Sequence, residues 1–291
     1  MTFADSLKTK DFVFTAHIDM AEAPDADSLI RQGEILRPAV DAVQLTDSTQ
    51  EVMSGLAAAA ILIQQGIDPI VHMSCRDRNR IAMQKDFIGA TAIGVSSVLV
   101  LRGKKFLHST KLGVRNVFDT SALDFMAYIE GLKRDESQSL DSDFLVGANA
   151  EVFNPDADWT PNNLIRKCDA GANFMQLQIC FDMDVVRNYM NLMIASRLTH
   201  KASFMMALAP FPSAEAARWV KENVKGALVP DPIVERLEQS SDPEREGIEI
   251  CAELIRELTT IPGVSGVNLL AMGELEAIPA AIEASGIRHS S

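Results

Sequence analysis

Residues 42–74 read AVQLTDSTQEVMSGLAAAAILIQQGIDPIVHMS and contain the pattern that decides the fold. Two short apolar runs, 42–46 and 69–74, flank a stretch at 51–66 in which apolar residues recur three and four positions apart. Short runs of β-branched and apolar residues are typical of buried strands, and the wider spacing is typical of a helix with one apolar face. The stretch therefore predicts a strand, a crossover helix and a second strand parallel to the first.

The same alternation recurs along the whole chain. Eight apolar runs are expected to form strands, at residues 12–18, 42–46, 69–74, 97–101, 144–148, 174–179, 204–209 and 264–272. Helical spacing fills the connections at 26–40, 51–66, 78–94, 121–134, 162–172, 184–198 and 214–226. Two further helical segments, 232–240 and 245–258, have no strand between them, so we expect an elaborated seventh connection near 230–262.

These patterns predict an α/β protein in which residues 1–291 form one domain, a single (βα)8 TIM barrel. Eight strand–helix units of about 30 residues each would use the full chain. A doubly wound open sheet is the alternative arrangement of the same units, and we favour the barrel.

The charge balance narrows the range of partners. The chain has 27 Lys and Arg against 40 Asp and Glu, a formal net charge of −13, so most of its surface would repel nucleic acid and anionic lipid. We therefore expect neither a nucleic-acid nor a membrane partner. We expect a cytoplasmic location, because the N-terminal MTFADSLKTKDF lacks the apolar run of a signal peptide. We also expect a homo-oligomer. The four cysteines are far apart and form no C-x-x-C pair, which predicts reduced thiols and no metal site.

Polar side chains lie within the apolar runs or directly after them. In a parallel barrel the active site is built at the C-terminal ends of the strands, so these residues are the first candidates for a site. They include His17, Asp19, Thr46, Asp47, His72, Ser74, Arg76, Asp77, Asn149, Glu151 and Asp182. For His72, a purely structural role inside an apolar strand is the open alternative.

Two glutamines interrupt the sixth run. In NFMQLQICF, Gln176 and Gln178 are two positions apart and therefore point to the same face of the strand. A buried amide needs hydrogen-bond partners, which a planar ligand such as a pterin or a flavin could supply. Hydrogen bonds between the two amides or to water are the alternative.

A basic segment follows the fourth run. Residues 102–115, RGKKFLHSTKLGVR, contain Arg102, Lys104, Lys105, Lys111 and Arg115, and this local charge could hold an anionic cofactor. Arg166 and Lys167 could add cations to the same rim, and a solvated charge run is the alternative. Since neither G-x-G-x-x-G nor G-x-x-x-x-G-K-[ST] occurs, a phosphate would be held by side chains.

Four motifs resemble one known family. HMSCRDRN, VLVLRG, KCDAGANFMQLQICFD and GVNLLAMGELEAI together resemble methylenetetrahydrofolate reductases in order and spacing, over nearly the whole chain. The resemblance is to the short, flavin-dependent bacterial form without a regulatory domain. It implies a (βα)8 barrel that holds FAD at the C-terminal ends of the strands. It also implies hydride transfer between NAD(P)H, as co-substrate, and the one-carbon unit of a tetrahydrofolate derivative.

The resemblance also implies roles for single residues. Gln178 matches a glutamine that contacts the pterin of the folate, with Gln176 on the same face, and Asn149 stands where the family often has a tyrosine near the flavin. The positions that match FAD contacts of the family are Thr46, His72, Arg102, Gly103, Ala148, Arg166 and Lys167.

The chain departs from the family at three positions. His17 stands where the family has a catalytic glutamate, the proposed general acid at folate N10, and Asp19 follows two residues later. Lys104 replaces an aspartate near the flavin and the pterin, and Glu274 replaces an arginine of the folate site. We therefore take His17, Asp19 and Lys104 as the candidate catalytic residues.

The leading functional hypothesis is a flavin-dependent oxidoreductase that interconverts 5,10-methylenetetrahydrofolate and 5-methyltetrahydrofolate. A cation at Lys104 would favour hydride acceptance by the flavin, so we expect oxidation of 5-methyltetrahydrofolate to be the favoured direction. Two alternatives stay open. One is a flavin-independent NAD(P)H–folate reductase, and the other is a folate-binding or methyl-transferring barrel without redox chemistry.

Overall fold

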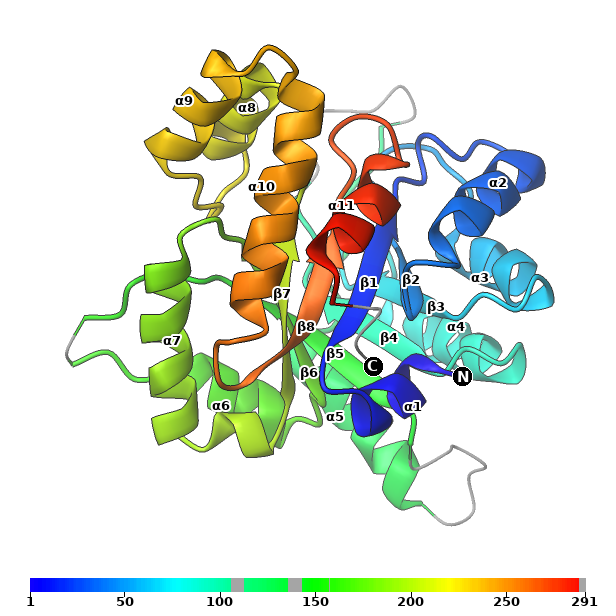
Figure 1. Cartoon of the computed structure of the whole chain (residues 1–291). Coiled ribbons are helices and arrows are strands. Elements are labelled where there is room, and N and C mark those ends of the chain that lie inside the picture. Colours follow the sequence, from blue (N-terminus) through cyan, green and yellow to red (C-terminus); the bar gives the residue numbers. More distant parts are fainter. Residues whose placement is uncertain (106–112, 136–142, 157, 288–291) are drawn as a thin grey trace.

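Eight parallel strands form a closed barrel in the computed structural model, which describes residues 1–105, 113–135, 143–156 and 158–287 (Figure 1). Consecutive strands are neighbours, and β8 pairs with β1 to close the sheet. This arrangement confirms the TIM barrel expected from the alternation of strands and helices. The strands are β1 (Val13–Ile18), β2 (Ala42–Leu45), β3 (Pro69–Ser74), β4 (Ser97–Leu101), β5 (Leu145–Ala150), β6 (Phe174–Ile179), β7 (Ser203–Leu208) and β8 (Val264–Leu269).

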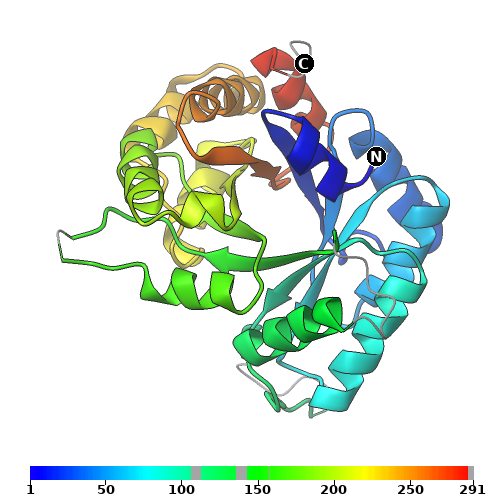
Figure 2. The same ribbon diagram turned by 90° about the horizontal axis from the view of Figure 1, so that it is seen from below.

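Helices surround the barrel (Figures 1 and 2). None of those in the described part of the chain combines the length and apolar character that a bilayer-spanning segment requires. The helices are α1 (Phe3–Thr9), α2 (Ala26–Leu36), α3 (Gly55–Gln64), α4 (Arg80–Ala92), α5 (Ala122–Arg134), α6 (Asn162–Asp169), α7 (Met183–Ala195), the 3₁₀ turn η1 (Leu198–His200), α8 (Ala214–Asn223), α9 (Asp231–Gln239), α10 (Pro243–Leu258) and α11 (Ala277–Ser285).

Two helices were not expected from the sequence. The first, α1, has seven residues, too few for a helical period to stand out, although a capping box between Thr2 and Asp5 marks its start. The second, α11, follows β8, which ends at Leu269 rather than at 272 as expected. In the elaborated connection, α9 and α10 occupy the two segments in which helices were expected.

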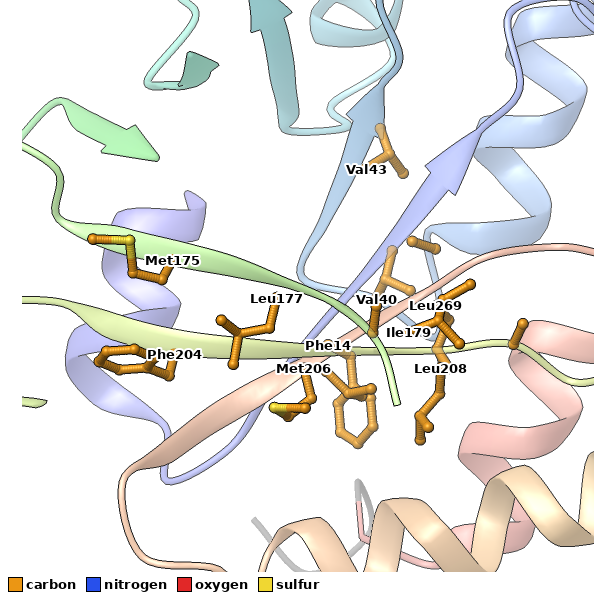
Figure 3. Close-up of a cluster of buried hydrophobic side chains, with 14 of the residues drawn as sticks. Phe14, Val40, Val43, Met175, Leu177, Ile179, Phe204, Met206, Leu208 and Leu269 are labelled. Atoms are coloured by element: carbon orange, nitrogen blue, oxygen red, sulfur yellow. The ribbon is translucent and has the colours of Figure 1, made fainter. Parts of the chain in front are cut away.

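The larger hydrophobic core lies between the strands and the helices. Figure 3 shows part of it, including Phe14, Met175, Phe204 and Met206, which come from β1, β6 and β7. These residues alternate along each strand with residues that point into the barrel, because successive side chains of a strand face opposite sides. The side chains that point into the barrel are therefore not part of this core and can form the floor of a site.

A second, smaller core fills the N-terminal end of the barrel. Phe3 of α1 is fully buried there, and its ring centroid lies 5.2 Å from that of Phe174 in an edge-to-face contact. Gly147 of β5 leaves room for this aromatic pair, since a Cβ atom at Gly147 would lie 2.2 Å from the Phe174 ring. Val13, Ala42 and Ile70, at or near the start of their strands, belong to the same cluster. This end is therefore packed, and the open end is the C-terminal one.

Candidate functional site

A cavity of about 630 Å³ opens at the C-terminal ends of the strands. Its volume lies within the range of small-molecule and cofactor sites, which is about 300–1,000 Å³. Side chains from inside the barrel form its floor, namely His17, His72, Gln176 and Asn268. The residues of its wall and rim include Thr46, Arg102, Gly103, Lys104, Asn149, Glu151, Gln178 and Lys225.

The floor rests on a layer of buried amides and hydroxyls inside the barrel. Gln44 Nε2 donates to Gln176 Oε1 at 2.8 Å and to Thr15 Oγ1 at 3.2 Å, and Thr15 Oγ1 donates to Asn268 Oδ1 at 2.8 Å. Thr15, Gln44 and Asn268 have no exposed surface, and Gln176 is 7% exposed. Buried polar groups of this kind are stable only when they are hydrogen-bonded. Among the described residues, the side-chain atoms of this layer meet that condition except Asn268 Nδ2.

Two histidines connect this layer to the cavity. His17 Nε2 and His72 Nε2 each lie 2.9 Å from Gln44 Oε1, and the ring centroids are 5.3 Å apart at an interplanar angle of 78°. His17 is partly exposed to the cavity, whereas His72 is 8% exposed. The sequence placed both residues at strand ends, and the structure brings them together.

Both imidazoles are neutral at pH 7. Burial lowers the pKa of His17 from 6.5 to about 4, although the hydrogen bond with Gln44 and the charge of Asp19 raise it in part. Burial also lowers the pKa of His72 well below 6.5, and the neighbouring His17 lowers it further. A neutral imidazole can accept a proton, so His17 faces the cavity as a base.

Four of the residues matched to FAD contacts line the cavity, namely Thr46, His72, Arg102 and Gly103. The Arg102 guanidinium lies 4.7 Å from the centre of the Phe118 ring, which holds the cation at the wall. Gly103 has a φ of 83°, and a Cβ atom there would lie 2.7 Å from Arg76 Cβ. Only glycine permits this close turn, which directs Arg102 and Lys104 to the mouth of the barrel.

The other three matched residues do not line the cavity. Because β5 runs to Ala150, Asn149 points inward to the cavity, and the adjacent Ala148 lies in the core between strands and helices. Arg166 and Lys167 are on α6, where Lys167 Nζ donates to the Asn149 carbonyl oxygen at 2.5 Å. The roles of Ala148, Arg166 and Lys167 at a cofactor therefore stay predictions.

The structure separates the three candidate catalytic residues. His17 is on the floor of the cavity and Lys104 is on its wall. Asp19 is exposed, lies outside the set of lining residues, and accepts a hydrogen bond from the Ala21 backbone N–H at 2.9 Å. Of the two ionisable residues near the end of β1, His17 faces the cavity and Asp19 does not.

The glutamines of β6 differ in what they offer to a ligand. Gln176 is held inside the barrel by Gln44, whereas Gln178 lines the rim and is partly exposed. Gln178 Oε1 accepts from the Ile179 backbone N–H at 2.9 Å, and Gln178 Nε2 donates to the Lys225 carbonyl oxygen at 3.1 Å. Both amides line the cavity and are hydrogen-bonded within the protein, and Gln178 is the more exposed of the two.

An ion-pair cluster beneath the rim received no role from the sequence. Arg76 is 2% exposed, and its Nη2 lies 2.8 Å from Asp77 Oδ2 and 3.4 Å from Asp47 Oδ1. Asp47 Oδ2 also lies 3.2 Å from Arg78 Nη1 and 3.0 Å from the Ser74 backbone N, to which it is hydrogen-bonded. The sequence signal for this cluster is the run of charges in CRDRN, directly after an apolar run. In the structure, the ion pairs of the cluster fix the loops after β2 and β3.

Thr15, Gln44 and Asn268 were not among the residues expected at the site. Each is a polar residue at an inward position of an otherwise apolar strand, in VFTAHI, AVQL and VSGVNL. The period of two along a strand, which puts Gln176 and Gln178 on one face, is the sequence signal that identifies these three residues as well.

The remaining candidate groups show no metal or disulfide site. Cys75, Cys180 and Cys251 are buried, Cys168 is partly exposed, and all four are free thiols. No cluster of three His, Cys, Asp or Glu side chains in the described ranges could hold a metal ion. Lys111 of the basic segment lies outside the described residues, and Arg115 is exposed away from the cavity lining.

Two solved structures with the same fold are distant from this chain in sequence. An uncharacterized protein from Clostridium thermocellum that binds two copies of 5-methyl-5,6,7,8-tetrahydrofolic acid has a TM-score of 0.64 at 12% identity, covering 99% of both chains. EDTA monooxygenase from Chelativorans sp. BNC1 has a TM-score of 0.60 at 12% identity, covering 97% of this chain and 94% of its own. At this level of identity the likeness shows the fold alone.

Sequence comparison gives the closer relationship. A probable methylenetetrahydrofolate reductase (NADPH) from Caenorhabditis elegans is 25% identical over 242 residues, which cover 80% of this chain and 34% of the relative. The chain thus spans about a third of the length of that relative. The family model described as methylenetetrahydrofolate reductase matches residues 27–286, which confirms the resemblance of the four motifs. The chain belongs to the methylenetetrahydrofolate reductase family.

Proposed function

We propose that the protein is an oxidoreductase that interconverts 5,10-methylenetetrahydrofolate and 5-methyltetrahydrofolate, with FAD as cofactor and NAD(P)H as co-substrate. The observation that supports this best is the cavity at the barrel mouth, with His17 on its floor and Arg102 and Lys104 on its wall, in a chain of this family. When bound, FAD supplies hydride transfer between the nicotinamide and the one-carbon unit of the folate.

The cavity residues fit FAD in three respects. Asn268 Nδ2 is buried and has no hydrogen-bond partner among the described residues, so it can donate to a polar ring atom. The tight turn at Gly103 brings the backbone to the cavity without a side chain. Arg102 and Lys104 provide the positive charge that a diphosphate requires.

The favoured direction we propose is oxidation of 5-methyltetrahydrofolate. When N10 of the folate bonds to the oxidised one-carbon unit and closes the ring, the N10 proton has to leave. His17 is neutral at pH 7 because burial lowers its pKa to about 4, so it is a proton acceptor rather than a donor at that pH.

We expect the Arg102→Ala variant to bind FAD more weakly by about 1.5–3 kcal/mol, the range for hydrogen bonds to charged groups. Arg102 would contribute a charge-assisted bond to the diphosphate from the cavity wall. Titration of the apoprotein with FAD measures the change. Arg115→Ala is the matched control, since Arg115 belongs to the same basic segment but does not line the cavity. Equal affinities of the wild type and Arg102→Ala would remove Arg102 from the site.

Gln178→Leu should reduce folate affinity by about 1–3 kcal/mol. The amide of Gln178 both donates and accepts, which matches the edge of a pterin, and the leucine would leave polar ring atoms unpaired. Isothermal titration with 5-methyltetrahydrofolate gives the affinity directly. If the variant binds as tightly as the wild type, the Gln178 amide serves only the Ile179 and Lys225 backbone groups it already contacts.

Lys104→Asp should lower the midpoint potential of bound FAD. Reduction adds negative charge, which a cation on the cavity wall stabilises and an anion opposes. One charge at about 5 Å contributes about 3 kcal/mol at an effective dielectric constant of 20, and solvent screening of the exposed side chain leaves a shift on the order of 20–30 mV. Spectroelectrochemical titration measures it, with Lys105→Asp as the control outside the cavity. A potential that stays the same or rises in Lys104→Asp contradicts the charge argument.

The visible spectrum of the purified protein tests the proposed function as a whole. We expect the two absorption bands of oxidised flavin and their bleaching by NAD(P)H or by 5-methyltetrahydrofolate. A colourless protein that couples NAD(P)H to folate would indicate a flavin-independent reductase. A protein that binds folate and exchanges no electrons would indicate a folate-binding or methyl-transferring barrel, and either result rejects the proposal.

A further inference from the structure

The buried layer beneath the cavity determines which ring nitrogen of each floor histidine carries a proton. The oxygen and nitrogen atoms of an amide are similar in shape, so their orientation has to be argued from partners that can only accept or only donate. Backbone carbonyl oxygens are such partners, because they only accept. Two of them lie at one end of the layer.

Two backbone carbonyl oxygens fix the orientation of the Gln176 amide. One end of its amide lies 3.2 Å from the Leu177 carbonyl oxygen and 3.4 Å from the Met205 carbonyl oxygen. That end must be the NH2 group, because an amide oxygen there would face two carbonyl oxygens and could not form a hydrogen bond with either. Gln176 Oε1 therefore points at Gln44.

The orientation of Gln44 follows. The Gln44 atom that lies 2.8 Å from Gln176 Oε1 must be Nε2, and the same nitrogen donates to Thr15 Oγ1. The Thr15 hydroxyl hydrogen is then available for Asn268 Oδ1, which leaves Asn268 Nδ2 as the end of that amide without a partner among the described residues. Gln44 Oε1 is left to face the two histidines.

We infer that Gln44 is a positioning residue that holds His17 and His72 as their Nε2–H tautomers, so that Nδ1 of each ring is an unprotonated acceptor. The amide oxygen lies 2.9 Å from both Nε2 atoms and can only accept, so each Nε2 must carry a hydrogen. A neutral imidazole has one N–H, so Nδ1 has none. Within the described ranges neither Nδ1 atom has a protein hydrogen-bond partner.

The consequence for the site rests on the proposed function. Because Nε2 of His17 is hydrogen-bonded to Gln44, Nδ1 is the atom of His17 that can take the folate N10 proton. The low pKa values of both rings, which burial causes, keep them neutral at pH 7 and so preserve one tautomer each. The charged groups that line the cavity or act on the pair are Asp19, Asp47, Arg76, Arg102, Lys104, Glu151 and Lys225, and of these Asp19 acts on the pKa of His17.

Nitrogen NMR of protein labelled with ¹⁵N-histidine tests the inference without folate or turnover. We expect the His17 and His72 signals, assigned by their loss in His17→Gln and His72→Gln, to show protonated Nε2 and unprotonated Nδ1 at neutral pH. A protonated Nδ1 on either ring of the wild type would overturn the inference. Because the spectrum needs neither substrate nor activity, the inference and the proposed function can fail independently.

Two variants separate Gln44 from the rest of the core. In Gln44→Met the amide is absent, and we expect both rings to lose the single-tautomer signature and show averaged shifts. In Thr15→Val one partner of Gln44 is lost but Gln176 still orients the amide, so both rings should keep the wild-type signature. Unchanged tautomers in Gln44→Met, or an equal change in Thr15→Val, would each remove the positioning role from Gln44.

Gln44→Glu keeps the size of the side chain and should raise the pKa of at least one ring by about 1–3, because an opposite charge then faces it.

Discussion

Replacing His17 by glutamine is expected to slow the oxidation of 5-methyltetrahydrofolate by about 10²-fold or more, while reduction of the bound cofactor by NAD(P)H keeps its rate. Positioned proton transfer contributes at least about this factor, and only the folate half-reaction moves a proton at N10. Glutamine can still hydrogen-bond to Gln44 but cannot take up a proton, so it isolates the acid–base role. Stopped-flow measurement of the two half-reactions, followed by flavin absorbance, gives the two rates separately.

Asp19 offers the matched comparison. It follows His17 by two residues, is exposed and lies outside the cavity lining. If Asp19→Asn loses the folate half-reaction and His17→Gln retains it, the proton acceptor is Asp19 and the orientation seen at the end of β1 changes when folate binds. Equal folate rates in the wild type and His17→Gln would exclude His17 from proton transfer.

Acidification from pH 7 to pH 4 is expected to destabilise the wild type by about 3 kcal/mol more than the His17→Gln variant. The folded-state pKa of His17, about 4, lies below its ordinary value of 6.5, so the unfolded chain binds more protons between these values. The free energy of unfolding therefore falls as pH decreases through this window, and it is fully recovered above pH 6.5. The gap between the two pKa values corresponds to about 3 kcal/mol.

Urea unfolding at several pH values between 4 and 7 measures this difference. Asp68 has a raised pKa because it is buried, and its contribution has the opposite sign, but it is present in both proteins and cancels in the comparison. Parallel stability curves for the wild type and His17→Gln would mean that His17 is solvated in the folded protein and has an ordinary pKa. The same result would weaken its assignment as a neutral base.

The fold could be predicted from the sequence because its signals are local. Strand and helix periods are visible within a few residues, and the eight apolar runs match β1 to β8 with differences of up to three residues at their ends. His17, Thr46, Arg102 and Gln178, which the sequence places at C-terminal strand ends, line one cavity, as expected for a barrel.

Some of the predicted site residues depended on facts that no local pattern contains. Ala148 was matched to the cofactor together with its neighbour Asn149, but adjacent residues of a strand face opposite sides, and the extent of β5 decides which one faces the cavity. Arg166 and Lys167 are on a helix, where the direction of a side chain depends on how the helix packs against the barrel.

The sequence by itself determined the barrel, the open end at which chemistry can occur and the residues at that end, because strand periodicity and chain direction are properties of short segments. Only the tertiary structure decided which inward side chains meet. Thr15 and Asn268 are 253 residues apart and Gln44 and Gln176 are 132 apart, yet closure of the sheet and the register of its strands bring each pair within hydrogen-bonding distance. The proton positions on His17 and His72 depend on those contacts, because the hydrogen bond that Nε2 makes with Gln44 determines whether Nδ1 carries a proton.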